Sequence, residues 1–198
     1  MMRFLRDALI TFVLLALIGG GLLYVQIREG GLSADAQPGR LERAVATRLV
    51  RLSIPADAER QHNPFRDDAS TWRSAVGHFE DHCAVCHGRD GRGKTAMGEN
   101  LYPKVPDLAA SLTQGRSDGA LFHIIQNGVR WTGMPAWKGE HSPEDTWKLV
   151  SLIRKMPSLT DRELDRIEKE MSSEPESTAR EKAPPHQHKS GSKPHTHR

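Results

Sequence analysis

The chain has 198 residues, of which 6% are aromatic and 27% are charged, and its formal net charge is +3. This length allows one domain with tails, and a mean hydropathy of −0.57 excludes a packed core along the whole chain. Lys and Arg form no concentrated stripe with aromatic residues between them, which argues against nucleic-acid binding. With only 2 cysteines, a disulfide framework is excluded.

The N-terminal segment predicts a membrane anchor. Residues 1–7 contain Arg3 and Arg6, and residues 8–27 contain no charged side chain, which is enough to span about 30 Å of hydrocarbon as a helix. The positive-inside rule places residues 1–7 in the cytoplasm and the rest of the chain in the periplasm or exterior. We therefore predict one transmembrane helix in the cytoplasmic (inner) membrane. The alternative is a cleaved signal peptide, because Ala34-Asp35-Ala36 resembles a cleavage site, although it lies well beyond the apolar run.

Residues 28–68 read as a linker between the anchor and the domain. Leu41, Val45, Leu49 and Leu52 recur at helical spacing, which predicts a short amphipathic helix. We expect its apolar face to pack on the domain rather than on the membrane. Residues 54–68 contain two prolines and no hydrophobic period, so we expect a surface strap there.

Residues 69–160 carry the predicted domain, and every element recognisable in it is a helix. The first helix starts near Ser70, and the second lies between Ser117 and Asn127-Gly128. Residues 88–115 are rich in Gly and Pro and predict a long loop. The third helix begins at Ser142-Pro143 and ends before Pro157, with an apolar stripe that includes Trp147, Leu149, Val150, Ile153 and Met156. The fold class is therefore all-α.

The C-terminal region divides into two parts. Thr160 and Glu163 form a capping box that predicts a charged helix over residues 161–172. Residues 173–198 are rich in Ser, Glu, Lys, Pro and His, and we assign this His-rich tail as disordered. The tail contains His186, His188, His195 and His197, whose imidazoles could bind a divalent metal weakly.

The residues Cys83-Ala84-Val85-Cys86-His87 carry the chemistry. In the spacing C-x-x-C-H, two thiols one helical turn apart can form thioethers with the vinyl groups of a haem, and the histidine can bind the iron. A thioredoxin-like pair would need a βαβ setting, and a zinc site would need two further ligands at matching spacing. We therefore predict one covalent haem c, bound through Cys83 and Cys86 and ligated by His87.

The second axial ligand is predicted to be Met134. It lies in the segment Trp131-Thr132-Gly133-Met134-Pro135, a loop between two helices that Gly and Pro constrain. Met156 falls on a helical core stripe, and Met97 is only ten positions after His87; Met97, a histidine or no ligand remain the alternatives. A thioether stabilises reduced iron and raises its potential relative to two histidines. Two filled axial positions favour electron transfer over catalysis.

From about residue 70 to 157 the chain resembles a class I c-type cytochrome, of the mono-haem, membrane-anchored bacterial kind. The resemblance rests on Gly77-x-Phe79, Cys83 to His87, Pro106-Asp107-Leu108, Gln126-Asn127-Gly128-Val129, Thr132 to Trp137 and Trp147. It implies the class I fold, with the first and last helices crossing near Gly77 and with Phe79 and Trp147 in the contact. It also implies that the Pro106 carbonyl orients the His87 ring and that His87 and Met134 are the axial ligands.

The leading functional hypothesis is a membrane-anchored carrier of single electrons, not itself an enzyme, between respiratory or dehydrogenase partners at the outer face of the membrane. One alternative is a peroxidase-like haem protein that uses His123 or His141 as an acid–base group. Another is a metal-handling protein that uses the His-rich tail. Trp131, Tyr102 and Arg130 are candidates for contacting the haem propionates, whereas His78 and His82 are expected to face solvent and not to bind a metal.

Overall fold

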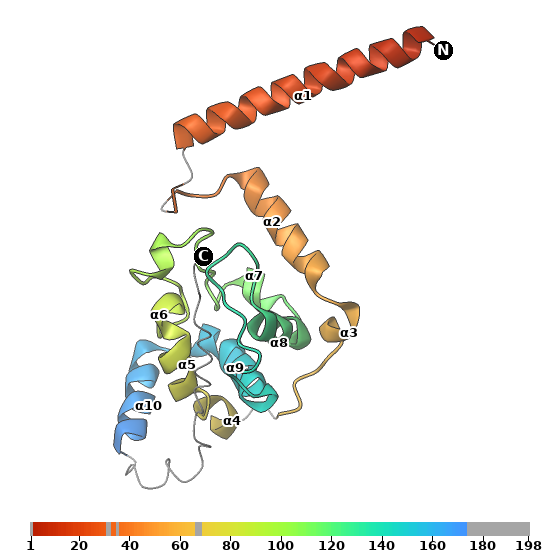
Figure 1. The fold of residues 1–198 in the computed structure, drawn as a ribbon. Coiled ribbons are helices and arrows are strands. Elements are labelled where there is room, and N and C mark those ends of the chain that lie inside the picture. The colour runs from red at the N-terminus through yellow and green to blue at the C-terminus, as the bar shows by residue number, and fades with distance from the viewer. Residues whose placement is uncertain (1, 31–32, 35, 66–68, 174–198) are drawn as a thin grey trace, which may run out of the picture.

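The computed structural model describes residues 2–30, 33–34, 36–65 and 69–173, and the His-rich tail lies outside this range. Over the described residues the chain is all-α, and the only bridge between extended residues there joins Lys138 and His141. The elements in chain order are α1 (Met2–Gly30), α2 (Arg40–Ser53), α3 (Ala56–Glu59), α4 (Ala69–Arg73), α5 (Val76–His82), α6 (Ala84–His87), η1 (Gly98–Asn100), α7 (Ser111–Gln114), α8 (Asp118–Asn127), α9 (Pro143–Lys155), η2 (Met156–Ser158) and α10 (Asp161–Ser173). This confirms the predicted fold class (Figure 1).

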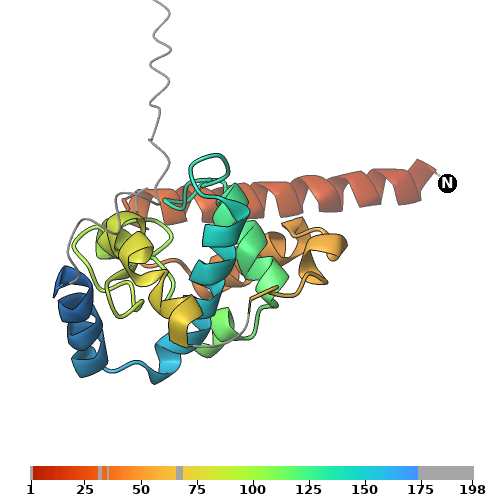
Figure 2. The ribbon, with the colours of Figure 1, turned by 90° about the horizontal axis from the view of Figure 1, so that it is seen from below.

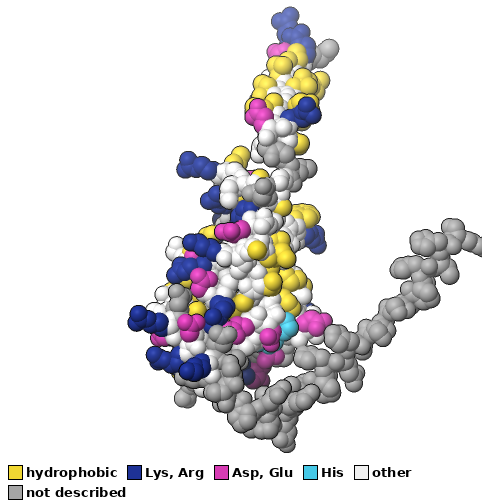
Figure 3. All heavy atoms as spheres, turned by 90° about the vertical axis from the view of Figure 1, so that its left-hand side faces the viewer, with side chains coloured by type: hydrophobic (Ala, Val, Ile, Leu, Met, Phe, Trp, Pro, Cys, Tyr) yellow, Lys and Arg dark blue, Asp and Glu magenta, His cyan; other side chains and the backbone are white. Residues whose placement is uncertain are grey.

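Helix α1 stands apart from the other helices in Figure 1, and its N-terminal end extends beyond them in Figure 2. Its segment Arg3–Glu29 has a mean hydropathy of 2.4, which by length and composition is enough to cross a membrane. Hydrophobic side chains cover it on the face shown in Figure 3, and none of its most apolar stretch is buried in the protein. Such a continuous apolar surface requires lipid or another protein to cover it.

Helix α2 lies where the apolar period predicts it, but its apolar face is not packed on the domain. None of its described residues is buried, and Leu41 remains 78% exposed. The expectation that this face packs on the domain is wrong because the helix meets the domain through polar groups: the Tyr102 hydroxyl donates a hydrogen bond to Glu42. Burial begins only beyond the helix end, where Ile54 packs with Ala58 and Ala120.

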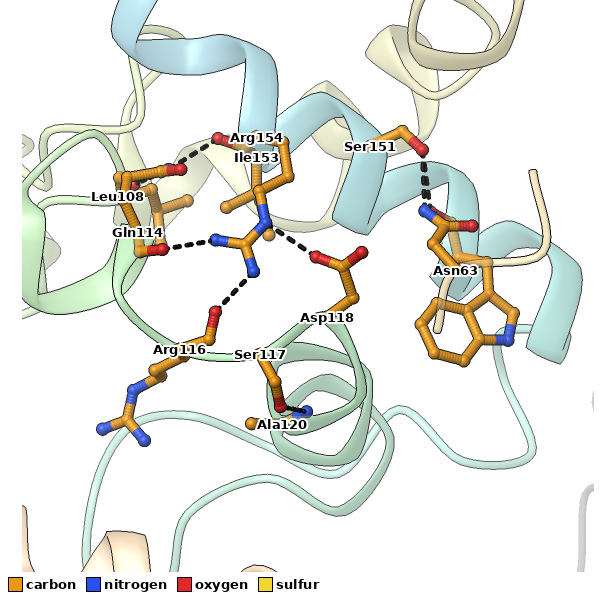
Figure 4. Close-up of polar contacts among 11 residues, drawn as sticks. Asn63, Leu108, Gln114, Arg116, Ser117, Asp118, Ala120, Ser151, Ile153 and Arg154 are labelled. Atoms are coloured by element: carbon orange, nitrogen blue, oxygen red, sulfur yellow. Dashed lines mark hydrogen bonds and ion pairs between the residues drawn. The ribbon is translucent and has the colours of Figure 1, made fainter. Parts of the chain in front are cut away.

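The strap after α2 is better ordered than the sequence predicted. It contains the one-turn helix α3, which packs against α8 so closely that a Cβ at Gly119 would lie 1.8 Å from the Ala58 carbonyl oxygen. Further along, the Asn63 amide donates to the Trp147 carbonyl at 3.0 Å and to the Ser151 hydroxyl at 2.8 Å. These bonds fix the strap to α9 (Figure 4).

Helix α9 is the centre of the core. It packs against α4, α5 and α8, and Leu149, Val150 and Leu152 are almost completely inaccessible to solvent. Each such side chain stabilises the fold by about 1.5–3 kcal/mol on burial. The start of α9 is as predicted, because Ser142 and Asp145 form a capping box and proline occupies the first turn.

An arginine on α9 fastens the helices that precede it. The Arg154 guanidinium donates to Asp118 at 2.7 Å and to the carbonyls of Gln114 at 2.7 Å and Arg116 at 2.5 Å. Figure 4 shows these bonds converging on one side chain. Since hydrogen bonds to a charged group are the stronger kind, Arg154 holds the α7–α8 turn against α9. These bonds fix the N-terminal end of α8.

The predicted first helix is divided in two. A turn at Ser74–Ala75 separates α4 from α5, but Trp72, Ala75, Val76 and Phe79 are buried on one side as the period indicates. At the other end of the domain, Thr160 and Glu163 cap α10 as predicted. Ile167 of α10 is 3% exposed and joins the core, so this charged helix is packed on the domain along one edge.

Candidate haem site

The C-x-x-C-H segment occupies the junction of α5 and α6. Cys83 lies between the two helices, and its carbonyl accepts hydrogen bonds from the backbone nitrogens of Cys86 at 3.1 Å and His87 at 2.9 Å. The two cysteines are therefore one helical turn apart, and both are free and half-buried. This is the arrangement that two thioether bonds to one haem require.

The environment of Cys83 argues against a dithiol redox pair. Burial, and to a lesser extent the neighbouring Cys86, raise the pKa of the Cys83 thiol to about 12. Redox-active cysteines need a lowered pKa, because the thiolate is the nucleophile. A raised pKa disfavours the thiolate of Cys83, and this fits a cysteine that forms a permanent bond better than one that cycles between thiol and disulfide.

His87 ends α6 and is half-buried. Gly88 follows it at a φ of 74°, which terminates the helix, and the Gly93 nitrogen donates to the His87 carbonyl at 2.6 Å. Burial lowers the pKa of His87, while the Pro106 carbonyl acts in the opposite direction, as an acceptor for a ring proton does. The ring Nδ1 is buried and makes no hydrogen bond of standard geometry. A lowered pKa favours the neutral imidazole, which is the form that binds a metal.

The loop after His87 is packed tightly over the motif. The Thr95 hydroxyl donates to the carbonyls of Val85 at 2.9 Å and Cys86 at 3.2 Å. A Cβ at Gly98 would lie 2.4 Å from the Cys86 carbonyl oxygen, so only glycine is tolerated there. The loop predicted from Gly and Pro content is thus closely fitted to the helix that carries the cysteines.

Met134 lies in a loop with its own hydrogen bonds. The Val129 nitrogen donates to the Met134 carbonyl at 3.1 Å, and the Met134 nitrogen donates to the Thr132 hydroxyl at 3.1 Å. The loop is then tied back to α8, because the Trp137 nitrogen donates to the Ile125 carbonyl at 3.2 Å. Met134 is half-buried and packs against the same core cluster as Cys83. Cys83 and Met134, which are predicted to hold the haem from different segments, therefore border the same apolar cluster.

The other methionines weighed as ligands have different surroundings. Met156 is 3% exposed and lies under Gly91 in the core, as the helical stripe predicts. Met97 is 51% exposed at the start of η1. Of the three, Met134 combines a constrained loop with partial burial against the core cluster on which Cys83 also packs. The residues present therefore fit a haem attached at Cys83 and Cys86.

The three residues predicted to contact the haem propionates have different surroundings. Trp131 is 85% exposed with a φ of 61°, and the Arg130 guanidinium lies 5.9 Å from its ring centroid. Tyr102 is engaged with Glu42 of α2. Their role at the propionates stays a prediction.

The histidines of α5 differ from expectation. His82 is exposed as predicted, but His78 is half-buried and its ring centroid lies 4.1 Å from that of His141. The three rings form a cluster that the sequence analysis missed. The only local signal was the i, i+4 spacing of His78 and His82, because His141 joins them from a distant loop.

Parts of the chain are similar to known proteins. The family model described as "Cytochrome C oxidase, cbb3-type, subunit III" matches residues 70–153. The cbb3-type cytochrome c oxidase subunit FixPc of Rhizobium leguminosarum bv. viciae is 38% identical over 65 residues, which are 31% of this chain and 19% of that protein. A chain of the reducing HAO-like protein complex of Kuenenia stuttgartiensis superposes with a TM-score of 0.44 and 22% identity, covering 47% of this chain and 46% of that one. Together with the haem-attachment motif and the helical fold, the family and relative matches show that residues 70–153 form a class I c-type cytochrome domain.

Proposed function

We propose that this chain carries one covalent haem c, attached through Cys83 and Cys86 and ligated by His87 and Met134, and that it passes single electrons between redox proteins at the membrane. The sequence contains 2 cysteines and thus offers one attachment motif. The bound haem would supply an iron that alternates between two charge states differing by one electron. The residues around the iron determine whether it can also bind a small molecule.

The placement of Met134 is the observation that carries the proposal. Its loop is constrained by Gly128, where φ is 66° and a Cβ would approach the Met134 carbonyl oxygen to 2.7 Å. Such a pre-formed loop can present a sulfur ligand without reorganisation, and a thioether ligand favours the reduced iron. With His87 and Met134 both bound to it, the iron would have no open position for a small molecule. The peroxidase-like alternative would need that position open.

The domain organisation of the proposal follows the helices. Residues 1–7 would lie in the cytoplasm and residues 8–27 in the bilayer. Residues 28–68 would link this anchor to the cytochrome domain of residues 69–160. Residues 161–172 would form the charged helix that follows the domain. Arg3 and Arg6 support an outward-facing haem domain. An anchor of this kind raises the effective concentration for partners in the same membrane.

The name of the relative indicates what class of redox partner to propose for this chain. It is a subunit of a cbb3-type cytochrome c oxidase, and we propose that this chain likewise exchanges electrons with a membrane-bound oxidoreductase complex, either as a subunit or as a tethered donor.

Carbon monoxide binding by the reduced full-length protein tests the closed site. We expect the spectrum of reduced wild-type protein to be unchanged by CO, because the Met134 sulfur occupies the sixth position. The Met134→Ala variant should bind CO readily. Wild-type protein that is five-coordinate, binds CO without displacing a ligand and turns over peroxide would contradict the carrier function and support the catalytic alternative.

A further inference from the structure

We propose that His78, His82 and His141 form a second metal site, which binds one Zn²⁺ or Cu²⁺ ion through three imidazole nitrogens. The site shares no ligand with the candidate haem site. Two of its ligands come from α5 and the third from the residue before the N-cap of α9.

The geometry brings one ligand atom of each ring to the same point. These atoms all lie within 4.8 Å of one another, and the ring centroids of His82 lie 4.9 Å from His78 and 5.0 Å from His141. Residues four apart on a helix share a face, which is why His78 and His82 point together. An ion with bonds of about 2.0–2.1 Å to nitrogen needs only a small inward movement of the rings.

His141 is the fixed member of the cluster. It is 4% exposed, and neither ring nitrogen has a hydrogen-bond partner although both are buried. Its ring stacks on Trp137 with centroids 4.4 Å apart, and its backbone nitrogen donates to the Trp137 carbonyl at 2.9 Å. Buried polar groups without partners are rare in folded proteins and require an explanation. A metal ion bound to one of the nitrogens satisfies that atom.

The charge state also suits a metal. Burial first, and then the neighbouring His78 and His82, lower the pKa of His141 to about 4, whereas Asp145 acts in the opposite direction. The ring is therefore neutral at pH 7, as a ligand must be. Three close imidazoles repel one another when protonated, which favours neutral rings that can share a metal ion.

The exposure of the cluster is graded in a way that leaves an entry path. His141 is buried, His78 is half-buried and His82 is exposed. An ion can thus approach from the His82 side and keep a water molecule there as its fourth ligand. Three histidines with one open position are typical of zinc, and imidazole suits copper equally.

The test is calorimetric titration of the haem-loaded full-length protein with Zn²⁺ alone and with Cu²⁺ alone. The tail histidines His186, His188, His195 and His197 are first changed to Gln, so that the tail does not contribute. We expect one equivalent to bind in this background. The His141→Gln change should weaken binding by more than about 100-fold, because even groups that only support a ligand are worth roughly 10–100-fold.

Two further variants guard against misfolding and non-specific binding. His82→Gln alters an exposed side chain and should lower affinity while the haem spectrum and unfolding temperature stay unchanged. His62→Gln removes an exposed histidine outside the cluster and should leave affinity as it was. Cu²⁺ bound by the cluster should show an electron paramagnetic resonance spectrum with nitrogen ligands, which changes in each cluster variant. No stoichiometric binding, or equal affinity in His62→Gln and His82→Gln, would overturn the site.

Discussion

At the scale of single residues, glycines decide how closely the loops can approach the candidate haem ligands. Gly128 has a φ of 66°, and a Cβ there would lie 2.6–2.7 Å from backbone atoms of the Met134 loop. The sequence indicated a helix stop at Asn127-Gly128, but it could not show that the same glycine makes room for Met134. That role depends on a contact between segments that only the fold brings together.

The change Gly128→Ala should weaken the hold on Met134. Left-handed backbone alone costs a non-glycine residue about 1–2 kcal/mol, and the clash adds to this. Gly139→Ala is the matched control, because Gly139 has a φ of 100° but open space around its Cβ position. We expect both variants to unfold at lower temperature, and only Gly128→Ala to lose methionine ligation in the absorption spectrum. Equal spectra in the two variants would contradict this.

At the scale of the helices, local sequence signals were sufficient to predict where helices begin and end. They were not sufficient to predict what covers the apolar face of a helix. Ser142 and Pro143 marked the start of α9, and Ser117 marked that of α8, because capping is a property of neighbouring residues. The exposed face of α2 could not be predicted, since an apolar period shows that a face exists and not what covers it. The His78–His82–His141 cluster escaped for the same reason, because its third member arrives through the packing of the Trp137 loop.

Helix α2 therefore offers a prediction about stability. Leu49 is 56% exposed and Ile54 is 7% exposed, five positions apart in the chain. Leu49→Gln should change the free energy of unfolding of the domain by less than about 0.5 kcal/mol. Ile54→Ala should cost about 2–5 kcal/mol, because it opens a cavity against Ala58 and Ala120. Chemical denaturation followed by circular dichroism measures both. A Leu49→Gln variant as unstable as Ile54→Ala would show that the apolar face of α2 packs on the domain.

At the scale of the whole molecule, the arrangement is a cytochrome domain joined by a linker to an apolar helix. The class of the domain could be predicted from the sequence, because C-x-x-C-H is a short and strict pattern and it occurs at Cys83–His87. The attachment of the domain to the membrane was predicted from the apolar composition of the N-terminal segment and from the charges that precede it. It is therefore open to a direct test on the expressed protein.

The anchor should remain on the mature chain. We expect the full-length protein to stay in the membrane fraction after washing with high salt and alkaline carbonate, because a helix of this hydropathy does not leave lipid. N-terminal sequencing checks that the chain still begins at its first residues. A soluble protein that begins after Ala36 would show instead that residues 1–36 are a signal peptide.

The central claim is that His87 and Met134 close the two faces of one haem, and the far-red charge-transfer band between methionine sulfur and ferric iron tests it most directly. We predict that the oxidised wild-type protein shows this band. Met134→Leu should abolish it, whereas Met97→Leu, at an exposed methionine, should retain it at full intensity. A wild-type protein without the band, or a band that survives in Met134→Leu, would contradict the account.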